Sequence, residues 1–161
     1  MGTNAENGAE IFKQYIGKED PAGQWVTIDQ DRINKFADCT EDHQFIHVDP
    51  EKCAQLSPFK VPIAHGFLTL SMLTRLSASD TPVPYMAGYA GILMGVNYGF
   101  EKVRFISPVK VNSRIRMRRE LVKVELVNPN TVNLTHKCTV DIDGEAKPAC
   151  VAEWITRLVY G

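Results

Sequence analysis

The sequence has almost no excess of charge of either sign. Its 161 residues include 18 Lys and Arg against 19 Asp and Glu, which leaves a formal net charge of −1. Proteins that bind nucleic acid through its phosphates are generally basic, so this balance argues against a nucleic-acid partner. Hydrophobic residues make up 44% of the chain and charged residues 23%, which is typical of a folded globular domain and argues against disorder.

The sequence also lacks the patterns of metal-binding, redox and membrane proteins. Its four cysteines are dispersed and form no C-x-x-C pair, so neither a structural zinc site nor a redox dithiol is supported. No apolar run is long enough to span a membrane, and the first residues lack the basic and apolar segments of a signal peptide. We therefore expect a cytoplasmic protein with reduced cysteines and no membrane contact.

The length of the chain indicates one domain. Residues 1–9 are mostly polar and are expected to be flexible, and residues 10–161 are expected to form the single domain. Residues 27–30 (TIDQ) have the Thr and Gln spacing of a capping box and predict the start of a helix. Asp49-Pro50 predicts the start of a second, shorter helix, because Asp is a favourable N-cap and Pro suits the first helical position.

The middle of the chain predicts a helix that is apolar on most sides. It runs from Gly66 to about Ala78. A helix of this kind in a soluble protein must be wrapped by other structure. Its hydrophobic residues are Phe67, Leu68, Leu70, Met72, Leu73 and Leu76.

The second half of the chain predicts strands. Apolar and polar residues alternate from 132 to 142, and Asp143-Gly144 follows as a turn. The β-rich stretches lie at residues 91–106, 111–127, 132–142 and 148–160. A buried helix followed by antiparallel strands indicates an α+β class in which the sheet curls around the helix, a hot-dog arrangement.

The densest polar cluster, residues 40–50 (TEDHQFIHVDP), is expected to be a loop between helices. Asp42 and His47 could converge across a turn as a general acid–base pair that works near neutral pH. A metal site made by His43, His47 and Asp49 is the chemical alternative, although no familiar ligand spacing is present. Asp49 is explained by its N-cap position, whereas spacing alone leaves Asp42 and His47 open between a catalytic and a structural role.

Gly66 opens the predicted apolar helix, so its N–H has no partner within the helix and lies at the positive end of the helix dipole. Such an N–H could stabilise negative charge on a substrate carbonyl oxygen. Gly66 could equally serve only to permit close packing. His65, just before it, is interpreted as structural rather than catalytic.

Two further features are interpreted as structural. His136 lies on the apolar face of the alternating strand at 132–142 and is expected to be a hydrogen-bonded core histidine. The basic stretch of another strand is expected to be a solvated face, with contact to a ligand phosphate as the alternative. Its members are Arg114, Arg116, Arg118, Arg119 and Lys123.

Several segments, taken in order, resemble the MaoC-like hydratase family, which contains the (R)-specific enoyl-CoA hydratases. They are EDHQFIHVDP at residues 41–50, PIAHGFLTLS at 62–71 and NYGFEKVRF at 97–105. The resemblance is to the nodulation-protein-N-like branch and covers roughly residues 10–158. It implies the hot-dog fold and a homodimer with two active sites near the interface.

The resemblance also implies roles for individual residues. Asp42 and His47 match the catalytic pair, and Gly66 matches the backbone oxyanion donor. Thr74 falls nearest an additional serine of some members. Gln44 and Phe45 stand where Asn and Pro are usual, which affects substrate range rather than the catalytic pair. The residues expected to contact the substrate are Gln44, Phe45, His65, Phe67, Leu70 and Thr74.

The function implied is reversible syn hydration of a trans-2-enoyl-CoA to an (R)-3-hydroxyacyl-CoA by Asp42 and His47. No metal or redox cofactor is expected, because the CoA or acyl-carrier-protein thioester is itself the substrate. Two alternatives remain open at this point. One is a non-catalytic module that binds acyl thioesters or regulates through them. The other is a thioesterase on the same fold, against which the two motif blocks at residues 41–50 and 62–71 argue.

Overall fold

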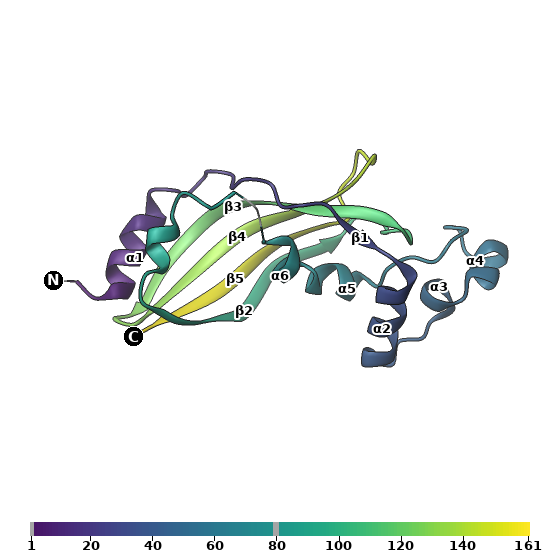
Figure 1. The fold of residues 1–161 in the computed structure, drawn as a ribbon, viewed down its shortest axis with the longest axis horizontal. Helices are drawn as coiled ribbons and strands as arrows, with labels where there is room; N and C mark the ends of the chain where they lie inside the picture. Colours follow the sequence, from purple (N-terminus) through teal and green to yellow (C-terminus); the bar gives the residue numbers. More distant parts are fainter. Residues whose placement is uncertain (1, 79–80) are drawn as a thin grey trace.

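The computed structural model describes residues 2–78 and 81–161, and it shows one antiparallel sheet with helices packed against it (Figure 1). The sheet has five strands in the order β1-β3-β4-β5-β2. The long, curved strands β2 to β5 form its body, and β2 has a free edge. The strands are β1 (Val26–Ile28), β2 (Ile92–Phe105), β3 (Ser113–Asn128), β4 (Thr131–Ile142) and β5 (Cys150–Tyr160).

The four long strands predicted from the alternating pattern are confirmed. Strand β4 pairs with β3 on one side and β5 on the other, and most of its residues are buried. The turn at Asp143-Gly144 is also present, and Gly144 has a φ of +77°, which favours glycine. The return strand begins only at Cys150, so residues 143–149 form a loop that is longer than a two-residue hairpin.

The helices lie at both ends of the sheet and beside its middle (Figure 1). Near the two termini lies α1, whereas α2, α3 and α4 gather at the opposite end and α5 and α6 lie between. None of the helices in the described ranges is long and apolar enough to cross a membrane. They are α1 (Asn4–Lys13), α2 (Gln30–Thr40), α3 (Phe45–Val48), α4 (Pro50–Leu56), α5 (Gly66–Ser71), α6 (Leu73–Leu76) and a 3₁₀ helix at Met86–Tyr89.

One of the two predicted helix starts is right and one is wrong. Helix α4 begins as predicted, with the Asp49 carboxylate accepting a hydrogen bond from the N–H of Lys52 at 2.9 Å. Helix α2 is capped by Asp29 and not by a capping box from Thr27. Thr27 belongs instead to β1 and pairs with Arg114 of β3, because the sheet continues up to the helix start.

The N-terminal segment differs from the prediction of a flexible tail. Residue 1 lies outside the described residues, but residues 4–9 form the first turns of α1. Thr3 and Glu6 make a reciprocal capping box, and Ala5, Ala9 and Phe12 are fully buried. Burial of these apolar side chains therefore orders the segment. The sequence did not indicate this, because polar residues predominate in it.

The apolar helix expected from Gly66 to Ala78 is present but divided. Helices α5 and α6 meet at Met72, and the side facing the sheet is buried, for example at Leu73. Phe67, on another side of α5, is 70% exposed. One copy of the chain therefore does not wrap this helix on all sides, because the helix lies near the free edge of the sheet.

Candidate active site

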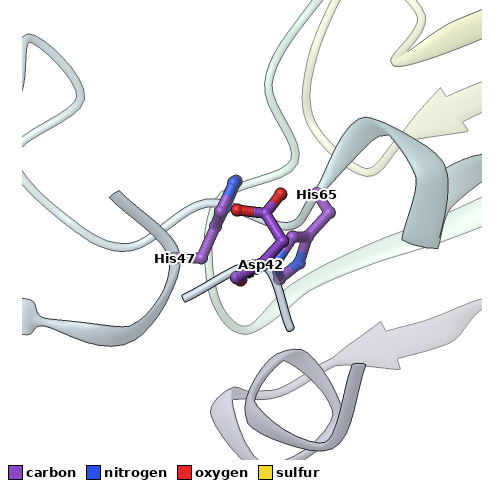
Figure 2. A group of neighbouring side chains, drawn as sticks. All are labelled: Asp42, His47 and His65. Atoms are coloured by element: carbon purple, nitrogen blue, oxygen red, sulfur yellow. Dashed lines mark hydrogen bonds between the residues drawn. The ribbon is translucent and has the colours of Figure 1, made fainter. Parts of the chain in front are cut away.

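Asp42, His47 and His65 come together beside the beginning of α5 (Figure 2). One carboxylate oxygen and one nitrogen from each ring all lie within 4.8 Å of one another. Asp42 is exposed, whereas His47 and His65 are buried. The carboxylate of Asp42 lies beside the His47 ring (Figure 2), so the two predicted acid–base residues are neighbours in space.

Local backbone geometry closes the five-residue gap between Asp42 and His47. Helix α2 ends at Glu41, whose φ of +59° is left-handed and reverses the chain. The single turn of α3 then brings His47 back toward Asp42. The expected loop is therefore confined to residues 41–44, which include Asp42, and α3 follows it within the segment that was expected to be loop throughout.

The protonation state of His47 is fixed by its surroundings. Its Nδ1 lies 2.7 Å from the carbonyl oxygen of Ile63, so Nδ1 carries the proton and donates this hydrogen bond. The lone pair of Nε2 is then available. Burial lowers the pKa of His47 below 6.5 and outweighs the opposing effects of the Ile63 hydrogen bond and the Asp42 charge. His47 is therefore a neutral base at pH 7.

His65 connects the two members of this pair. Its Nε2 donates a hydrogen bond to the backbone carbonyl of Asp42 at 3.0 Å. Its ring stacks on that of His47, with centroids 3.7 Å apart, and it also contacts Phe36. Nδ1 of His65 is buried and has no hydrogen-bond partner in the part of the chain that the structure describes. This geometry agrees with a structural role, since His65 holds both Asp42 and His47.

The geometry does not fit a metal ion. His43 pairs with Asp38 and Asp49 caps α4, so the metal set considered from sequence does not assemble. In the cluster that does form, the rings of His47 and His65 are inclined by only 23° and stacked. Ring lone pairs lie in the ring planes, so these two nearly parallel rings cannot both direct a nitrogen at one ion.

Gly66 is the first residue of α5 and is packed tightly. A Cβ at this position would lie 3.1 Å from the ring of Phe105 on β2, so a side chain would displace that ring. The N–H of Gly66 stands at the helix start, as expected from sequence, next to His65. A hollow of about 250 Å³ adjoins it, and its lining includes Gly66, Thr69, Phe105 and Ile106.

The other predicted substrate contacts fall into two groups. Leu70 and Thr74 line a hollow of about 220 Å³ together with Asn97, Phe100 and Trp154 of β2 and β5. The remaining residues lie outside it: Gln44 is the exposed N-cap residue of α3, Phe45 is the half-buried first residue of that helix, and Phe67 is exposed and packs edge-on against Phe105.

The sequence did not identify three residues beside the helix, Asn97, Phe105 and Trp154. Phe105 covers Gly66, and the other two line the hollow beside Thr74. Asn97 and Phe105 are the two ends of the NYGFEKVRF segment, whereas no motif marks Trp154. Strand pairing with β5 decides where these side chains lie, and no local pattern reports it.

His136 is the core histidine that was expected, whereas the basic stretch is not a solvated face throughout, because the side chain of Arg119 is only 16% exposed. His136 is 2% exposed, and its Nε2 lies 3.5 Å from the hydroxyl of Tyr85. Each cation of the basic stretch has a carboxylate partner, so the stretch is compensated and offers no evident phosphate site. The pairs are Arg114–Asp143, Arg116–Asp141, Arg118–Asp141, Arg119–Asp20 and Lys123–Glu125.

The chain is similar to known proteins over most of its length. Residues 12–142 match the family described as "MaoC like domain". The 3-hydroxyacyl-thioester dehydratase Z of Mycobacterium tuberculosis is 48% identical over 146 residues, which are 91% of this chain and 89% of that protein. Nodulation protein N of Rhizobium leguminosarum bv. viciae is 46% identical over 145 residues, covering 90% of this chain and 87% of that protein.

A solved structure supports the same assignment at the level of the fold. The unliganded R-hydratase PhaJ1 from Pseudomonas aeruginosa superimposes with a TM-score of 0.66 at 23% identity, covering 91% of this chain and 83% of that one. The curled antiparallel sheet with its helices is therefore the hot-dog fold predicted from the sequence. The matched family, the relatives at nearly half identity and the shared fold agree, and the chain belongs to the MaoC-like dehydratase family.

Proposed function

We propose that this protein is a 3-hydroxyacyl-thioester dehydratase that catalyses reversible syn hydration of trans-2-enoyl thioesters to the (R)-3-hydroxyacyl thioesters. The observation that carries this proposal is the pair formed by the Asp42 carboxylate and the buried, neutral imidazole of His47. The name of the mycobacterial relative, a 3-hydroxyacyl-thioester dehydratase, supports the same reaction class.

In the hydration direction, Asp42 and His47 hold one water between them. As the water oxygen attacks C3 of the enoyl group, the pair takes up a proton from the water and delivers a proton to C2 on the same face. The two groups share this water and titrate jointly, so both protons belong to the pair. The Nδ1–H of His47 donates its hydrogen bond to Ile63, so Nε2 is the nitrogen that exchanges protons.

The thioester carbonyl is oriented by the start of α5. Its oxygen gains negative charge as C2 takes on carbanion character, and the Gly66 N–H stabilises that charge. The absence of a side chain at Gly66 leaves room for the Phe105 ring beside the start of α5. The acyl chain continues past Phe67 and Leu70 toward Thr74. Either CoA or an acyl-carrier protein serves as the thioester carrier, and the reaction uses no metal or redox cofactor.

We also expect a cytoplasmic homodimer. Large apolar side chains are exposed along the free-edge strand β2, including Leu93 at 71% and Met94 at 55%. A second copy covering this strand would bury them and would close the open side of α5. All four cysteines are unpaired and three of them are buried, which suits a reducing compartment.

The test measures the hydration of crotonyl-CoA through the loss of the enoyl absorbance. Chiral analysis then identifies the product. Asp42→Asn and His47→Gln should each lower kcat by about two to four orders of magnitude, because each removes one member of the acid–base pair. Circular dichroism should report an unchanged fold. Production of the (R)-alcohol by the wild-type protein completes the expected result.

The chain offers a matched control in its other Asp–His pair. Asp38 and His43 are 2.9 Å apart but exposed, so Asp38→Asn and His43→Gln should retain wild-type turnover. Near-normal turnover in Asp42→Asn would contradict the proposed role. Acyl-CoA binding without turnover for any chain length would instead favour the non-catalytic module, and release of free thiol would favour a thioesterase.

A further inference from the structure

A row of polar residues crosses the concave face of the sheet between two apolar clusters. Along β3, Arg119 stands between Met117 of one cluster and Leu121 of the other. Neighbouring strands repeat the pattern, since residues two apart share a face. On β4 the polar residue is His136, between Cys138 and Leu134, and on β5 it is Thr156, between Trp154 and Leu158.

This polar row borders a hollow of about 240 Å³. Its polar lining includes Asn97, Arg119, His136 and Thr156. It shares Thr74, Asn97 and Trp154 with the hollow of about 220 Å³ beside α5, so the two are neighbours along one side of the helices.

One of the side chains that line the hollow has a hydrogen-bond donor without an acceptor in the described part of the chain. Trp154 is only 6% exposed, and its Nε1–H is buried with no hydrogen-bond partner among the residues that the structure describes. Indole and guanidinium groups can donate but cannot accept. Because a buried donor without an acceptor is costly, the Trp154 N–H favours a ligand that supplies an oxygen.

The net charge of the hollow favours a neutral oxygen over an anion. The guanidinium of Arg119 donates from Nε to the carboxylate of Asp20 at 2.6 Å, and Asp20 also accepts from the hydroxyl of Tyr85. The positive charge is thus already compensated. Burial and the nearby Arg119 charge lower the pKa of His136 to about 3, so this histidine adds no charge at neutral pH. A carboxylate in the hollow would lack a counter-charge.

The hollow lies within reach of a substrate bound at Gly66. One stripe along α5 and α6 consists of residues 66, 67, 70, 71 and 74. Its Gly66 end adjoins Phe105, and its Thr74 end adjoins Asn97. Eight residues of helix span about 12 Å. An extended chain covers that length in roughly ten bonds, since three backbone bonds advance about 3.5 Å.

We propose that the hollow bordered by Trp154, Arg119 and Asn97 binds a neutral oxygen, such as a ketone, near the distal end of a medium-length acyl chain. The inference rests on the proposed function, because it takes Gly66 as the position of the thioester. It assigns the substrate class as oxygenated acyl thioesters in preference to plain alkyl ones, and it makes Trp154 a specificity-determining residue.

The experiment compares trans-2-decenoyl-CoA with its 9-oxo analogue and with the thioester that carries a terminal carboxylate. The wild-type kcat/KM should be about tenfold higher for the 9-oxo substrate than for the alkyl substrate, and the carboxylate should be the poorer of the two oxygenated forms. Trp154→Phe keeps an aromatic ring but removes the N–H donor, so the oxo-to-alkyl ratio should fall to about one.

Trp25→Phe is the matched control, because Trp25 packs against Arg116 and lines neither hollow. Its oxo-to-alkyl ratio should equal that of the wild type. If Trp154→Phe does not fold, Thr156→Val removes a hydroxyl from the same hollow with little change of shape and should also lower the ratio. An alkyl preference, or a ratio unchanged in the folded hollow variants, overturns the proposal.

Binding separates this proposal from the proposed function. The chain has two tryptophans, so Trp25→Phe leaves Trp154 as the single indole fluorophore. Saturated 9-oxodecanoyl-CoA should bind about tenfold more tightly than decanoyl-CoA and shift the Trp154 emission. Absence of turnover with crotonyl-CoA, trans-2-decenoyl-CoA and its 9-oxo analogue, together with this preference, would refute the dehydratase but not the oxygen-binding hollow. Turnover with equal binding of both ligands would refute the hollow alone.

Discussion

The behaviour of His47 follows from three contacts. Burial disfavours the charged imidazolium, the hydrogen bond to Ile63 fixes the proton on Nδ1, and the ring of His65 stacks against it. Asp42 is the one neighbour whose charge favours protonation, and its effect is smaller than that of burial. One member of the acid–base pair is therefore kept uncharged at neutral pH, the state in which its Nε2 can take up a proton.

These contacts predict how the activity depends on pH. Protonation of His47 removes the Nε2 lone pair, so kcat/KM should rise as the pH rises through the His47 pKa. Because that pKa is lowered from 6.5, the midpoint of this rise should lie below 6.5. Titration of the ring protons by NMR, with His47→Gln to assign the resonance, measures the pKa directly. A His47 resonance that titrates at 6.5 or above would contradict the interpretation.

Sequence alone could predict the members of the pair but not the support around them. Asp42 and His47 are only five residues apart in the chain and are chemically distinctive, so a local motif is enough to find them. The stacking of His65 on His47 joins positions 18 residues apart and depends on how α3 and α5 meet. The covering of Gly66 by Phe105 depends in the same way on the pairing of β2 with β5.

At the scale of elements, periodicity predicted the type of each long strand but not its exposure. Strand β4 alternates and is central, whereas β2 carries more apolar residues and lies at the free edge. Exposed apolar side chains therefore collect on β2, and the apolar helix beside it stays open at Phe67. Apolar side chains that a single chain leaves exposed are explained by a second copy that covers them. Sequence periodicity does not predict where that second copy binds.

This arrangement predicts that charge on β2 weakens the proposed dimer. Leu93→Lys should shift the protein from a dimer toward a monomer in sedimentation equilibrium, because the ammonium would be desolvated at the interface. Leu56→Lys on α4 is the matched control, since Leu56 is 69% exposed against 71% for Leu93. It should remain dimeric. A wild-type protein that sediments as a monomer at micromolar concentrations would refute the expected dimer.

At the scale of the whole molecule, the core is two apolar clusters separated by a polar row. The cluster around α5 and α6 positions the active site, and the cluster around α1 buries Phe12 and Leu134. His136 lies between them with Arg119 and Tyr85 as its polar neighbours. The sequence placed His136 in the core correctly, but the neighbouring ion pair of Arg119 with Asp20 joins residues 99 apart in the chain and has no local signature.

The buried His136 should make the protein sensitive to acid. Its pKa is about 3 in the folded state and about 6.5 when the chain is unfolded, so below pH 6.5 the unfolded state binds a proton that the folded state does not. The resulting contribution to stability is complete above pH 6.5 and is lost as the pH falls from 6.5 toward 3, by about 1 kcal/mol per pH unit.

Urea unfolding between pH 7 and 4 should therefore show a shallower pH dependence of the unfolding free energy in His136→Gln than in the wild type. His43→Gln changes an exposed histidine and should keep the wild-type slope. Equal slopes for all three proteins would mean that His136 can take up its proton in the folded state, and that the polar row is open enough to solvate it.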